Sequence, residues 1–501
     1  MNFIYNLKKS LKENSSKNAL CIDEKFYTYK DLSNAINKTR LYIQKNIKPE
    51  EKLFGLVAND DLETYASIFA LWFENKAHIP INPIAPIDRN LKIFKSTNIN
   101  TVLDSSKNSD FSDSYNVFCT TKIDSNIEDY KLKEASFLAN EIAYILFTSG
   151  STGNPKGIPI SFKNLNALLS ALNSDDEYKL NSSDKCLQMY DLTFDASLTA
   201  FMPAFLAGAC SYTISSNSIK YFQVFKLLLK HELTVIKMVP TIINYLRPYF
   251  SEIMAINVRY CVFGGGKLNE DIVKEWIKCI PNSKLYNHYG PTECTVCSTY
   301  YNYKINDYNK SYNGVLSIGK PIKGIEFVII NDLKEKVEQG VQGELCLSGD
   351  QLTTGYWNND KLNKQSFFNT TNNEGLTKRF YRTGDICYLN EDGNLMYVER
   401  KDFQVKIRGF RVELGEIEYH IRNVIDNNIS VIDIDSENGN NEIALVIEGK
   451  KIDTNSIFEH LRNRIPNYMV PTKTFFVSKL PHNNNGKLDR KQLRKIIKKD
   501  D

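Results

Sequence analysis

The sequence lacks any long apolar segment and any large excess of one charge. No run in its 501 residues approaches the roughly 18 apolar residues of a membrane helix, and the opening MNFIYNLKKSLKENSSKNAL has no apolar core for a secretory signal. The net charge of +4 gives no reason to expect nucleic acid or an anionic membrane as a partner. Ten cysteines are scattered, and the lone C-x-x-C of Cys294 and Cys297 is weak evidence for a metal or redox site. We therefore expect a cytoplasmic protein with reduced thiols.

The sequence does contain an alternation of strand-like and helical patterns through most of the first 300 residues. A β-branched or aromatic run at 52–60 precedes a helical spacing at 62–74, and a run at 141–147 precedes one at 162–172. Further strand-like runs lie at 77–82, 233–238, 258–263 and 284–287, the last three each followed by a loop and a helical pattern. Such units predict an α/β fold with large, mostly parallel sheets covered by helices. Ligands gather outside the carboxyl ends of strands in such sheets.

The pattern changes along the second half of the chain. From about residue 315 the strands are shorter and turns are more frequent, which predicts a β-rich subdomain. A boundary is expected at Arg400-Lys401-Asp402, after which the chain has its own small alternation of strands and helices. We therefore predict a large N-terminal domain over 1–401 and a small, mobile C-terminal α+β domain over 402–501.

A candidate phosphate-binding loop, TSGSTGNPKG (148–157), follows the predicted strand 141–147. Its glycines let backbone amides turn towards a phosphate, its hydroxyls donate further hydrogen bonds, and Lys156 neutralises charge. A P-loop would need Gly-Lys-Ser/Thr in sequence, whereas a proline precedes Lys156 and no Ser or Thr follows it. The alternative is a flexible surface turn.

This loop resembles the signature loop of the adenylate-forming ligases, which include acyl-CoA synthetases, luciferases and the adenylation domains of nonribosomal peptide synthetases. The resemblance continues in order along almost the whole chain. It is carried by FDAS (194–197), NHYGPTE (287–293), YRTGD (381–385), ERKDFQVKIRGFRVELGEIE (399–418) and NGKLDR (485–490). One such motif would be weak evidence, whereas an ordered series is strong evidence.

The resemblance implies a reaction in which a carboxylate attacks the α-phosphate of ATP and expels pyrophosphate, so that cations and oriented donors must offset the repulsion of two anions. Thr148, Ser149, Ser151, Thr152 and Lys156 would hold the phosphates. Tyr289 would stack on adenine, Asp385 would accept from both ribose hydroxyls, and Arg400 would assist. Glu293 would bind Mg²⁺. The remaining ATP-binding residues implied by the motifs are Gly150, Gly153, Gly264, Asn287, Gly290 and Thr292. Taken singly, Tyr289 fits a core aromatic, Asp385 a turn residue and Glu293 a helix-start carboxylate equally well.

Lys487, in NGKLDR, matches the family lysine that contacts the carboxylate and the α-phosphate, so it joins Thr148 and Lys156 among the expected catalytic residues. Because Lys487 lies in the small domain, that domain would have to close by rotation about a hinge, here Asp402. One departure is that Glu399-Arg400 stands where the family usually has Gly-Arg, which leaves the local turn open.

Asp195, in FDAS, resembles the aspartate with which amino-acid-activating members bind the α-ammonium group; its alternative is a helix N-cap. Carrying over the family's pocket positions gives the substrate-binding set. Its members are Asp195, Ala196, Thr199, Lys237, Val262, Gly264, His288, Val296 and Cys297, with Lys487 last.

Lys237 is the informative member of this set. A lysine in a largely apolar pocket needs an anionic partner or a lowered pKa. Val262 and Gly264 leave space, and His288 stands opposite, so Lys237 and His288 are interpreted as a small cationic recess that fits a carboxylate one carbon beyond the α-carbon. The set resembles the pattern associated with aspartate, with substituted aspartates or asparagine as alternatives. Lys237 turned outward to solvent is the structural alternative.

The predicted function is therefore ATP- and Mg²⁺-dependent activation of an amino acid, aspartate first, with transfer to the phosphopantetheine thiol of a carrier protein. No carrier domain follows NGKLDR, so we expect the carrier to act in trans. The alternatives are a D-alanine–carrier protein ligase, an acyl-CoA synthetase and a catalytically silent nucleotide-binding protein on this fold. The pathway, the carrier, the configuration of the substrate, the carboxylate that is activated and the oligomeric state stay open.

Overall fold

A computed structural model describes residues 2–123, 134–150, 153–175, 177–215, 218–308, 310–371, 375, 377–402, 404–436, 439–481 and 488–500. The chain divides into two compact units. The first comprises Met1–Pro83, Phe94–Leu146 and Gly157–Lys401, and the second comprises Ile84–Ile93, Phe147–Lys156 and Asp402–Asp501. Each unit has its own hydrophobic core clusters.

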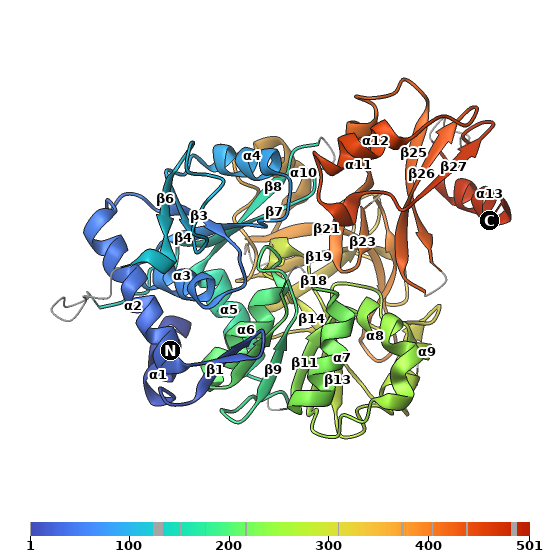
Figure 1. The fold of residues 1–501 in the computed structure, drawn as a ribbon. Helices are drawn as coiled ribbons and strands as arrows, with labels where there is room; N and C mark the ends of the chain where they lie inside the picture. The colour runs from blue at the N-terminus through green and yellow to red at the C-terminus, as the bar shows by residue number, and fades with distance from the viewer. Residues whose placement is uncertain are drawn as a thin grey trace. The chain divides into compact units, whose positions relative to one another are not determined.

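The first unit contains a nine-stranded sheet with the order β17-β14-β13-β12-β11-β9-β10-β1-β2 (Figure 1). The strands from β13 to β1 pair in parallel, whereas β2, β14 and β17 pair antiparallel at the two edges. The bounds are β1 Asn18–Ile22, β2 Lys25–Thr28, β9 Lys185–Gln188, β10 Cys210–Thr213, β11 Val235–Met238, β12 Tyr260–Gly264, β13 Lys284–Tyr289, β14 Thr299–Tyr303 and β17 Lys320–Pro321.

A second sheet has six strands in the order β6-β5-β3-β4-β7-β8. Its bounds are β3 Leu53–Val57, β4 Ala77–Ile81, β5 Thr101–Asp104, β6 Asn116–Cys119, β7 Ile142–Thr148 and β8 Lys156–Ser161. The pairings of β3 with β4 and β5, of β4 with β7 and of β5 with β6 are parallel. The predicted mostly parallel arrangement is thus confirmed, divided between two sheets.

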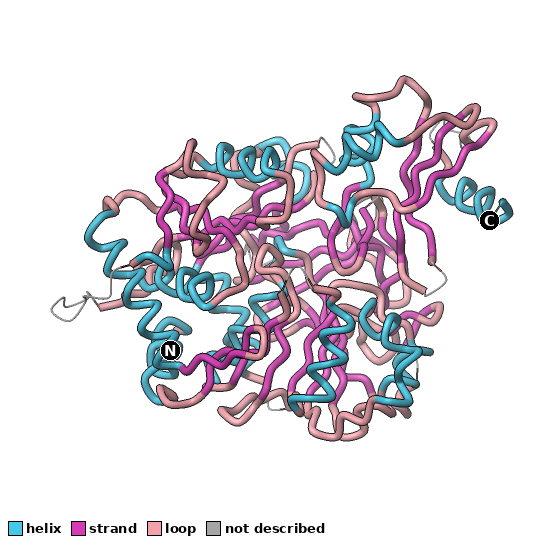
Figure 2. Tube along the Cα trace, viewed as in Figure 1, coloured by secondary structure: helices cyan, strands magenta, loops and turns pink. Residues whose placement is uncertain are grey.

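Helices cover these sheets, as the tube view makes visible (Figure 2). α3 packs on β3 and β4, α6 packs on β9 and β10, and α1, α2 and α5 pack with them. α7, α8 and α9 share a core cluster with the other face of the nine-stranded sheet. The bounds are α1 Phe3–Glu13, α2 Tyr29–Asn46, α3 Leu62–Phe73, α4 Ile87–Thr97, α5 Phe162–Asn173, α6 Ala196–Ala207, α7 Lys220–His231, α8 Thr241–Leu246 and α9 Glu270–Trp276, with 3₁₀ turns η1 Thr120–Lys122, η2 Arg247–Glu252 and η3 Thr292–Cys294.

One predicted connection is wrong. The helical pattern expected after 284–287 is the short turn η3 followed by β14, which returns antiparallel to β13. The reason is local, because Thr295 and Val296 both adopt positive φ (50° and 69°), a conformation that no helix continues through.

An antiparallel sheet completes the first unit and confirms the β-rich subdomain. Its order is β18-β19-β21-β20, with β22 paired to β21. The bounds are β18 Ile325–Ile330, β19 Gly343–Gly349, β20 Phe367–Thr371, β21 Thr377–Leu389 and β22 Leu395–Arg400, with the ribbon β15 Ser311–Tyr312 and β16 Val315–Leu316 and the helix α10 Asp360–Ser366 beside it in sequence.

The second unit is a small α/β domain. Its three-stranded sheet has the order β25-β26-β27, and the hairpin of β23 and β24 turns at Arg408 and Gly409, both with positive φ, as a two-residue hairpin requires. The bounds are β23 Gln404–Ile407, β24 Phe410–Glu413, α11 Leu414–Ile421, β25 Ile429–Asp435, β26 Asn441–Glu448, α12 Asn455–Arg462, η4 Asn467–Met469, β27 Lys473–Val477 and α13 Arg490–Asp500.

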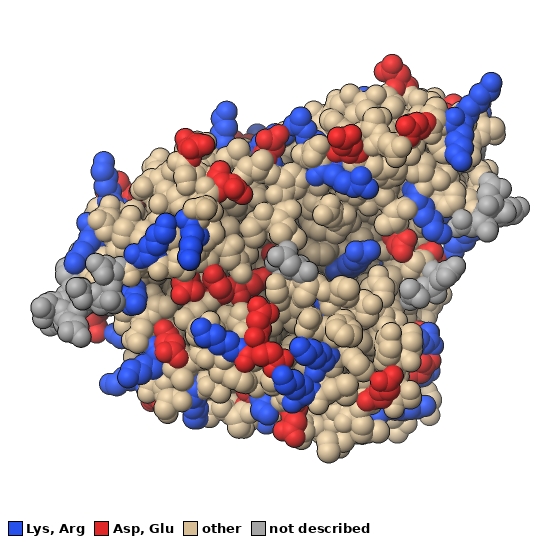
Figure 3. Space-filling view, viewed as in Figure 1, with Lys and Arg blue, Asp and Glu red and all other residues tan. Residues whose placement is uncertain are grey.

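On the face drawn in Figure 3, lysine and arginine side chains are interspersed with aspartate and glutamate, as the small net charge leads one to expect. Within the described ranges, none of the helices combines the length and the apolar character that a membrane span requires. All ten cysteines are free thiols, including Cys294 and Cys297.

Candidate functional site

Four of the predicted pocket residues share one face of the nine-stranded sheet. Lys237 of β11 is paired with Val262 of β12, and Gly264 at the end of β12 is paired with His288 of β13. Because side chains alternate along a strand, Val262 and Gly264 point to the same side. The register therefore brings these residues together at the carboxyl ends of three parallel strands.

Lys237 is held inside this face by α6. Only 5% of the residue is exposed, and its Nζ donates a hydrogen bond to Oγ1 of Thr199, which in turn donates to the backbone oxygen of Ala196 at 3.0 Å. Burial lowers the pKa of Lys237 to about 8, although Cys297 and Asp195 act in the opposite direction. The outward orientation considered above is therefore not the one that the lysine adopts.

Asp195 stands immediately before α6, at the N-cap position. Its backbone is helical (φ −61°, ψ −31°), and its side chain makes no capping hydrogen bond. By contrast, Asp61 at the same position of α3 accepts from the amide of Thr64 at 2.9 Å. The capping alternative for Asp195 is thus wrong, and its carboxylate lies near enough to Lys237 to favour the charged lysine.

His288 corrects the interpretation of a cationic recess. Its ring lies among Tyr178, Tyr286 and Tyr300, at centroid distances of 6.1 to 6.4 Å. Burial, and then the charge of Lys237, lower the pKa of His288 well below its usual value, so the imidazole is neutral. Its Nδ1 is buried without a hydrogen-bond partner among the described residues. Among the described residues of the predicted pocket, the cation Lys237 therefore lies beside a neutral ring.

Val296 and Cys297 follow the strained turn after η3. Val296 has a positive φ of 69°, which is costly for a β-branched residue. Gly290 makes the turn possible, because a Cβ there would lie 2.5 Å from the backbone oxygen of Val296. Cys297 is 1% exposed, and burial raises the pKa of its thiol to about 12, so it lines the pocket as a neutral group.

Tyr289, Asp385 and Arg400 form one buried cluster. The hydroxyl of Tyr289 donates to Oδ2 of Asp385 at 2.5 Å, and Nη1 of Arg400 lies 2.9 Å from Oδ1 of the same carboxylate. Asp385 on β21 and Arg400 on β22 are direct cross-strand partners. Glu399-Arg400 therefore ends a strand, which answers the question left open about the local turn.

Glu293, the predicted metal ligand, lies fully buried in η3. Its Oε1 accepts a hydrogen bond from the hydroxyl of Tyr356 at 2.6 Å, a partner that the motifs did not indicate. The described residues contain no group of three or more His, Cys, Asp or Glu that could hold a metal. This donor set fits Mg²⁺ bound mainly through phosphate oxygens and water, the usual arrangement for that ion.

Two further predicted ATP-binding residues lie nearby in sequence. Asn287 donates from Nδ2 to the backbone oxygen of Ser317 at 2.8 Å, and Thr292 begins η3.

The phosphate loop belongs to the second unit. Gly150 and Gly153 close a turn through an amide-to-carbonyl bond of 3.0 Å, and a Cβ on Gly150 would lie 2.1 Å from the backbone oxygen of Asn154. Thr148 Oγ1 is buried and has no hydrogen-bond partner among the described residues. Ser149 Oγ, the Gly150 amide and Lys156 Nζ bind oxygens of the segment 411–416. Anionic oxygens already occupy two of these donors, which is the chemistry that phosphates need.

Three predicted residues have no described position: Ser151, Thr152 and Lys487 lie outside the described residues. Asp402, the predicted hinge, is exposed and is the first residue of the last segment of the second unit. Its Oδ1 accepts from the amide of Gln404 at 3.1 Å.

The structure adds residues that the motifs did not assign. Glu413 and Glu416 contact the phosphate loop, and Arg89 pairs with Glu416 at 2.6 Å. Both glutamates lie within the motif 399–418, and two buried acids at the junction of a strand and a helix could have signalled this role. Arg89 carries no sequence signal.

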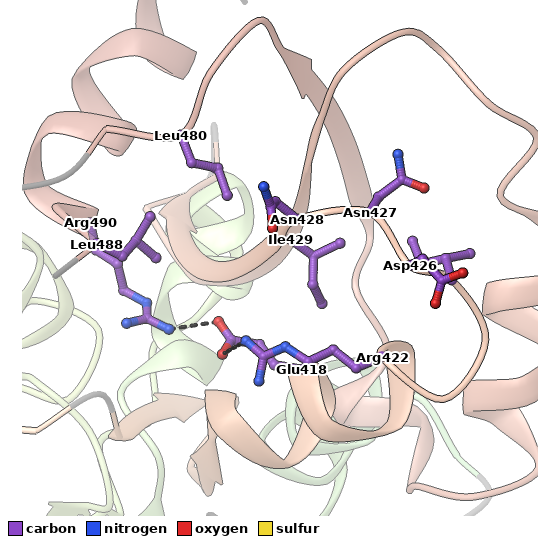
Figure 4. Close-up of a pocket in the computed structure, with 10 residues that line it drawn as sticks. Glu418, Arg422, Asp426, Asn427, Asn428, Ile429, Leu480, Leu488 and Arg490 are labelled. Carbon is purple, nitrogen blue, oxygen red and sulfur yellow. Dashed lines mark hydrogen bonds and ion pairs between the residues drawn. The ribbon is translucent and has the colours of Figure 1, made fainter. Parts of the chain in front are cut away.

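A hollow in the second unit is lined by ten described residues, none of which is a predicted site residue (Figure 4). Glu418 at its wall pairs with Arg490 at 2.6 Å and with Arg422 at 3.2 Å, and it also accepts from the amide of Val431 at 2.9 Å. These contacts tie α11 to β25 and α13, so Glu418 is a structural residue.

The comparison with known proteins agrees with this geometry. Residues 7–357 match the family model of the AMP-binding enzymes. The chain is 31% identical over 491 residues to one of the proteins that make up the linear gramicidin synthase of Brevibacillus parabrevis, and the match covers 95% of this chain and 9% of the relative. The chain spans from 7% to 43% of the length of several curated relatives that it matches.

Two solved structures share the fold. The Vibrio cholerae adenylation domain AlmE, in complex with glycyl-adenosine-5′-phosphate, is 25% identical with a TM-score of 0.84, and the match covers 99% of this chain and 98% of that one. The holo form of PA1221, a nonribosomal-peptide-synthetase protein that contains adenylation and PCP domains, has a TM-score of 0.85 at 22% identity and covers 98% and 84%.

Proposed function

This chain belongs to the AMP-binding enzyme family and is an adenylating ligase of the type found as peptide-synthetase adenylation domains, and we propose that its substrate is an amino acid with an anionic side chain, aspartate first. The single observation that carries the proposal is the buried Lys237 at the end of β11. A cation removed from water needs a compensating anion. A side-chain carboxylate of the substrate supplies it.

Asp195 provides the complementary charge. In the proposed complex its carboxylate accepts hydrogen bonds from the α-ammonium group, and the substrate side chain extends over Val262 and Gly264 towards Lys237. The electrostatic coupling of Asp195 and Lys237 supports this arrangement, because a substrate with both charges satisfies both residues. Thr199, which holds Nζ of Lys237, is proposed to orient it.

His288 contributes differently from what the sequence led us to expect. As a neutral imidazole with a buried and unpartnered Nδ1 among the described residues, it offers a hydrogen bond rather than a second positive charge. The neutral ring can therefore bond a substrate carboxylate. A protonated ring would instead repel the nearby Lys237, because both groups would be positively charged. Ala196, Val296 and Cys297 are proposed to close the pocket with small or apolar surface.

ATP is proposed to bind through two sets of residues. Asp385 exchanges the hydroxyl of Tyr289 for those of the ribose and keeps its ion pair with Arg400. Thr148, Ser149, Gly150 and Lys156 hold phosphate oxygens, together with Ser151, Thr152 and Gly153. Glu293 holds Mg²⁺, which when bound would neutralise phosphate charge.

The adenylation step forms a bond between the substrate carboxylate and the α-phosphorus and breaks the bond to the leaving pyrophosphate. Lys487 is proposed to contact both reacting groups, with Asp402 as the hinge of the segment that carries it. A carrier-protein thiol is proposed as the acceptor, in line with the adenylation and PCP domains of PA1221.

The D-alanine ligase alternative is weakened because the buried Lys237 would face the methyl group of alanine. The acyl-CoA synthetase alternative is weakened by Asp195, because a fatty or aryl acid has no α-ammonium group for it to bind.

Amino-acid-dependent ATP–pyrophosphate exchange across the standard amino acids tests the proposal. We expect exchange with aspartate. Exchange with alanine only would overturn the pocket assignment, and no exchange with any amino acid would favour a silent nucleotide-binding protein.

A further inference from the structure

Two glutamates of the second unit occupy the donors of the phosphate loop. Nζ of Lys156 lies 2.7 Å from Oε1 of Glu413, and the amide of Gly150 donates to Oε2 of Glu416 at 3.1 Å. Glu413 ends β24 and Glu416 lies in the first turn of α11. We refer to Glu413 and Glu416 together as the glutamate clasp.

The backbone beside the clasp fixes its register on the loop. Ser149 Oγ donates to the backbone oxygen of Arg411 at 2.9 Å and accepts from the amide of Glu413 at 3.0 Å. The side chains of Lys156 and Glu413 are only 13% and 11% exposed, so the ion pair is poorly screened by water. The loop is therefore held by four neighbouring contacts, two of them to carboxylates.

Each clasp carboxylate has another partner that does not belong to the loop. Glu413 accepts from Nε2 of Gln404 through the same oxygen that Lys156 contacts. Glu416 is fully buried and pairs with Nη1 of Arg89 at 2.6 Å. A carboxylate that leaves the loop thus keeps a donor, which lowers the cost of its release.

The geometry points to the glutamate clasp as an internal competitor for the phosphates of ATP, with Glu413 acting as a positioning residue for Lys156. This inference rests on the proposed function, because it takes the loop donors as phosphate ligands. The single N–H of the Gly150 amide cannot serve a phosphate oxygen and Glu416 at once. A phosphate brought against the Lys156 ammonium would also repel the carboxylate of Glu413, which carries the same sign of charge. Binding of the phosphates therefore releases Glu413 from Lys156, and departure of pyrophosphate lets the ion pair form again.

The competition affects both the binding of ATP and the release of pyrophosphate. The clasp lowers the affinity of the loop for ATP and for pyrophosphate alike, because both present the same oxygens. It then favours release of the leaving group, since a carboxylate takes its place on Lys156. Glu413 thus acts on the departure of pyrophosphate without touching the reacting carboxylate or the α-phosphorus.

Glu413→Gln tests this, because the amide keeps the size of the side chain but removes the charge. The probe is inorganic pyrophosphate, titrated into the full chain by isothermal titration calorimetry. We expect the dissociation constant to fall roughly tenfold, the worth of one charge-assisted hydrogen bond. Asp435→Asn is the matched control, since Asp435 pairs with Lys498 in the same compact unit, far along the chain from the loop. It should leave the dissociation constant unchanged.

A second measurement detects the release of Glu413 from the phosphate loop. Hydrogen exchange of the Glu413 amide, which is bonded to Ser149 Oγ, should accelerate when pyrophosphate is added to the unmodified chain. An unchanged or weaker affinity in Glu413→Gln, or a slower exchange at this amide, would overturn the competition. Thermal unfolding of both variants shows whether a change in affinity comes from altered folding.

Failure of the clasp and failure of the proposed function give different results. Suppose that the unmodified chain shows no amino-acid-dependent ATP–pyrophosphate exchange, but that Glu413→Gln still binds pyrophosphate more tightly. This result would rule out the adenylation proposal and leave the competition supported. Amino-acid-dependent ATP–pyrophosphate exchange in the unmodified chain, without a gain in the pyrophosphate affinity of Glu413→Gln, would rule out the competition alone.

Discussion

Lys237 Nζ donates a hydrogen bond to Oγ1 of Thr199, and the lysine is only 5% exposed. Burial lowers the pKa of Lys237 to about 8 from its usual 10.5, and lowering a pKa by one corresponds to about 1.4 kcal/mol against the charged form. A neutral residue of similar size would be more stable here. The retained lysine therefore points to a function, which we propose is recognition of a carboxylate.

Replacing Lys237 with methionine should separate stability from specificity. Lys237→Met fills the same space without a buried charge, so we expect the free energy of unfolding to rise by about 2 kcal/mol. The preference for aspartate should disappear in ATP–pyrophosphate exchange, while nucleotide affinity stays unchanged.

Lys220→Met is its matched control. Lys220 is another lysine whose pKa burial lowers, but it bonds the backbone oxygen of Met189 and is no part of the proposed pocket. It should leave substrate preference intact. If Lys237→Met still prefers aspartate, Lys237 does not bind the substrate side chain.

Aspartate activation should depend on pH through Lys237. Because the pKa of this group is lowered to about 8, the lysine loses its charge as the pH rises through that value. We expect kcat/KM for aspartate, which reports the free enzyme, to fall above pH 8, whereas turnover of a neutral amino acid should show no such step. The lowered pKa also means that the charged lysine is destabilising below pH 8 and that this effect is relieved as the pH approaches 10.5.

Asp195 and Asp61 distinguish a substrate ligand from a helix cap. Asp195→Ala should abolish amino-acid-dependent exchange with little change in stability, because the side chain makes no capping hydrogen bond. Asp61→Ala should cost about 1 kcal/mol of stability, because its side chain caps α3, and should leave exchange intact. Chemical denaturation and exchange assays on both variants check this, and a stability loss for Asp195→Ala as large as that for Asp61→Ala would contradict it.

Asp385→Asn should weaken nucleotide binding. The carboxylate is proposed to accept from the ribose hydroxyls, and the amide loses the charge that strengthens these bonds, so we expect affinity for AMP to fall roughly thirtyfold, or about 2 kcal/mol. Asp332→Asn serves as the comparison, since Asp332 pairs with Lys401 at the surface with 90% of its side chain exposed. Calorimetric titration with AMP measures both, and equal affinities in the two variants would remove Asp385 from the ribose site.

Local patterns predicted the elements that carry the site. The strand-like run 233–238 contains β11 (Val235–Met238), and the helical spacing 162–172 lies within α5 (Phe162–Asn173). These agree because periodicity reports which faces are buried. The helix predicted after β13 is instead the turn η3, because Thr295 and Val296 adopt positive φ, a conformation that hydrophobic periodicity does not report.

Charge states were harder to predict than positions. His288 lies on the strand where the motif places it, but its neutrality follows from burial among three tyrosines and from the charge of Lys237. Tyr286 is on the same strand, whereas Tyr178, Tyr300 and Lys237 come from other segments. Likewise, the pairing of Lys156 with Glu413 joins residues far apart in sequence. No local pattern encodes such contacts.

The most direct test of the account is the ratio of kcat/KM for aspartate and asparagine in ATP–pyrophosphate exchange. The two substrates have nearly the same shape and differ in the charge that Lys237 is proposed to recognise. The account predicts that aspartate exceeds asparagine by at least about a hundredfold at about pH 7, as expected when a buried charged partner is left uncompensated. Equal values, or a preference for asparagine, would contradict it.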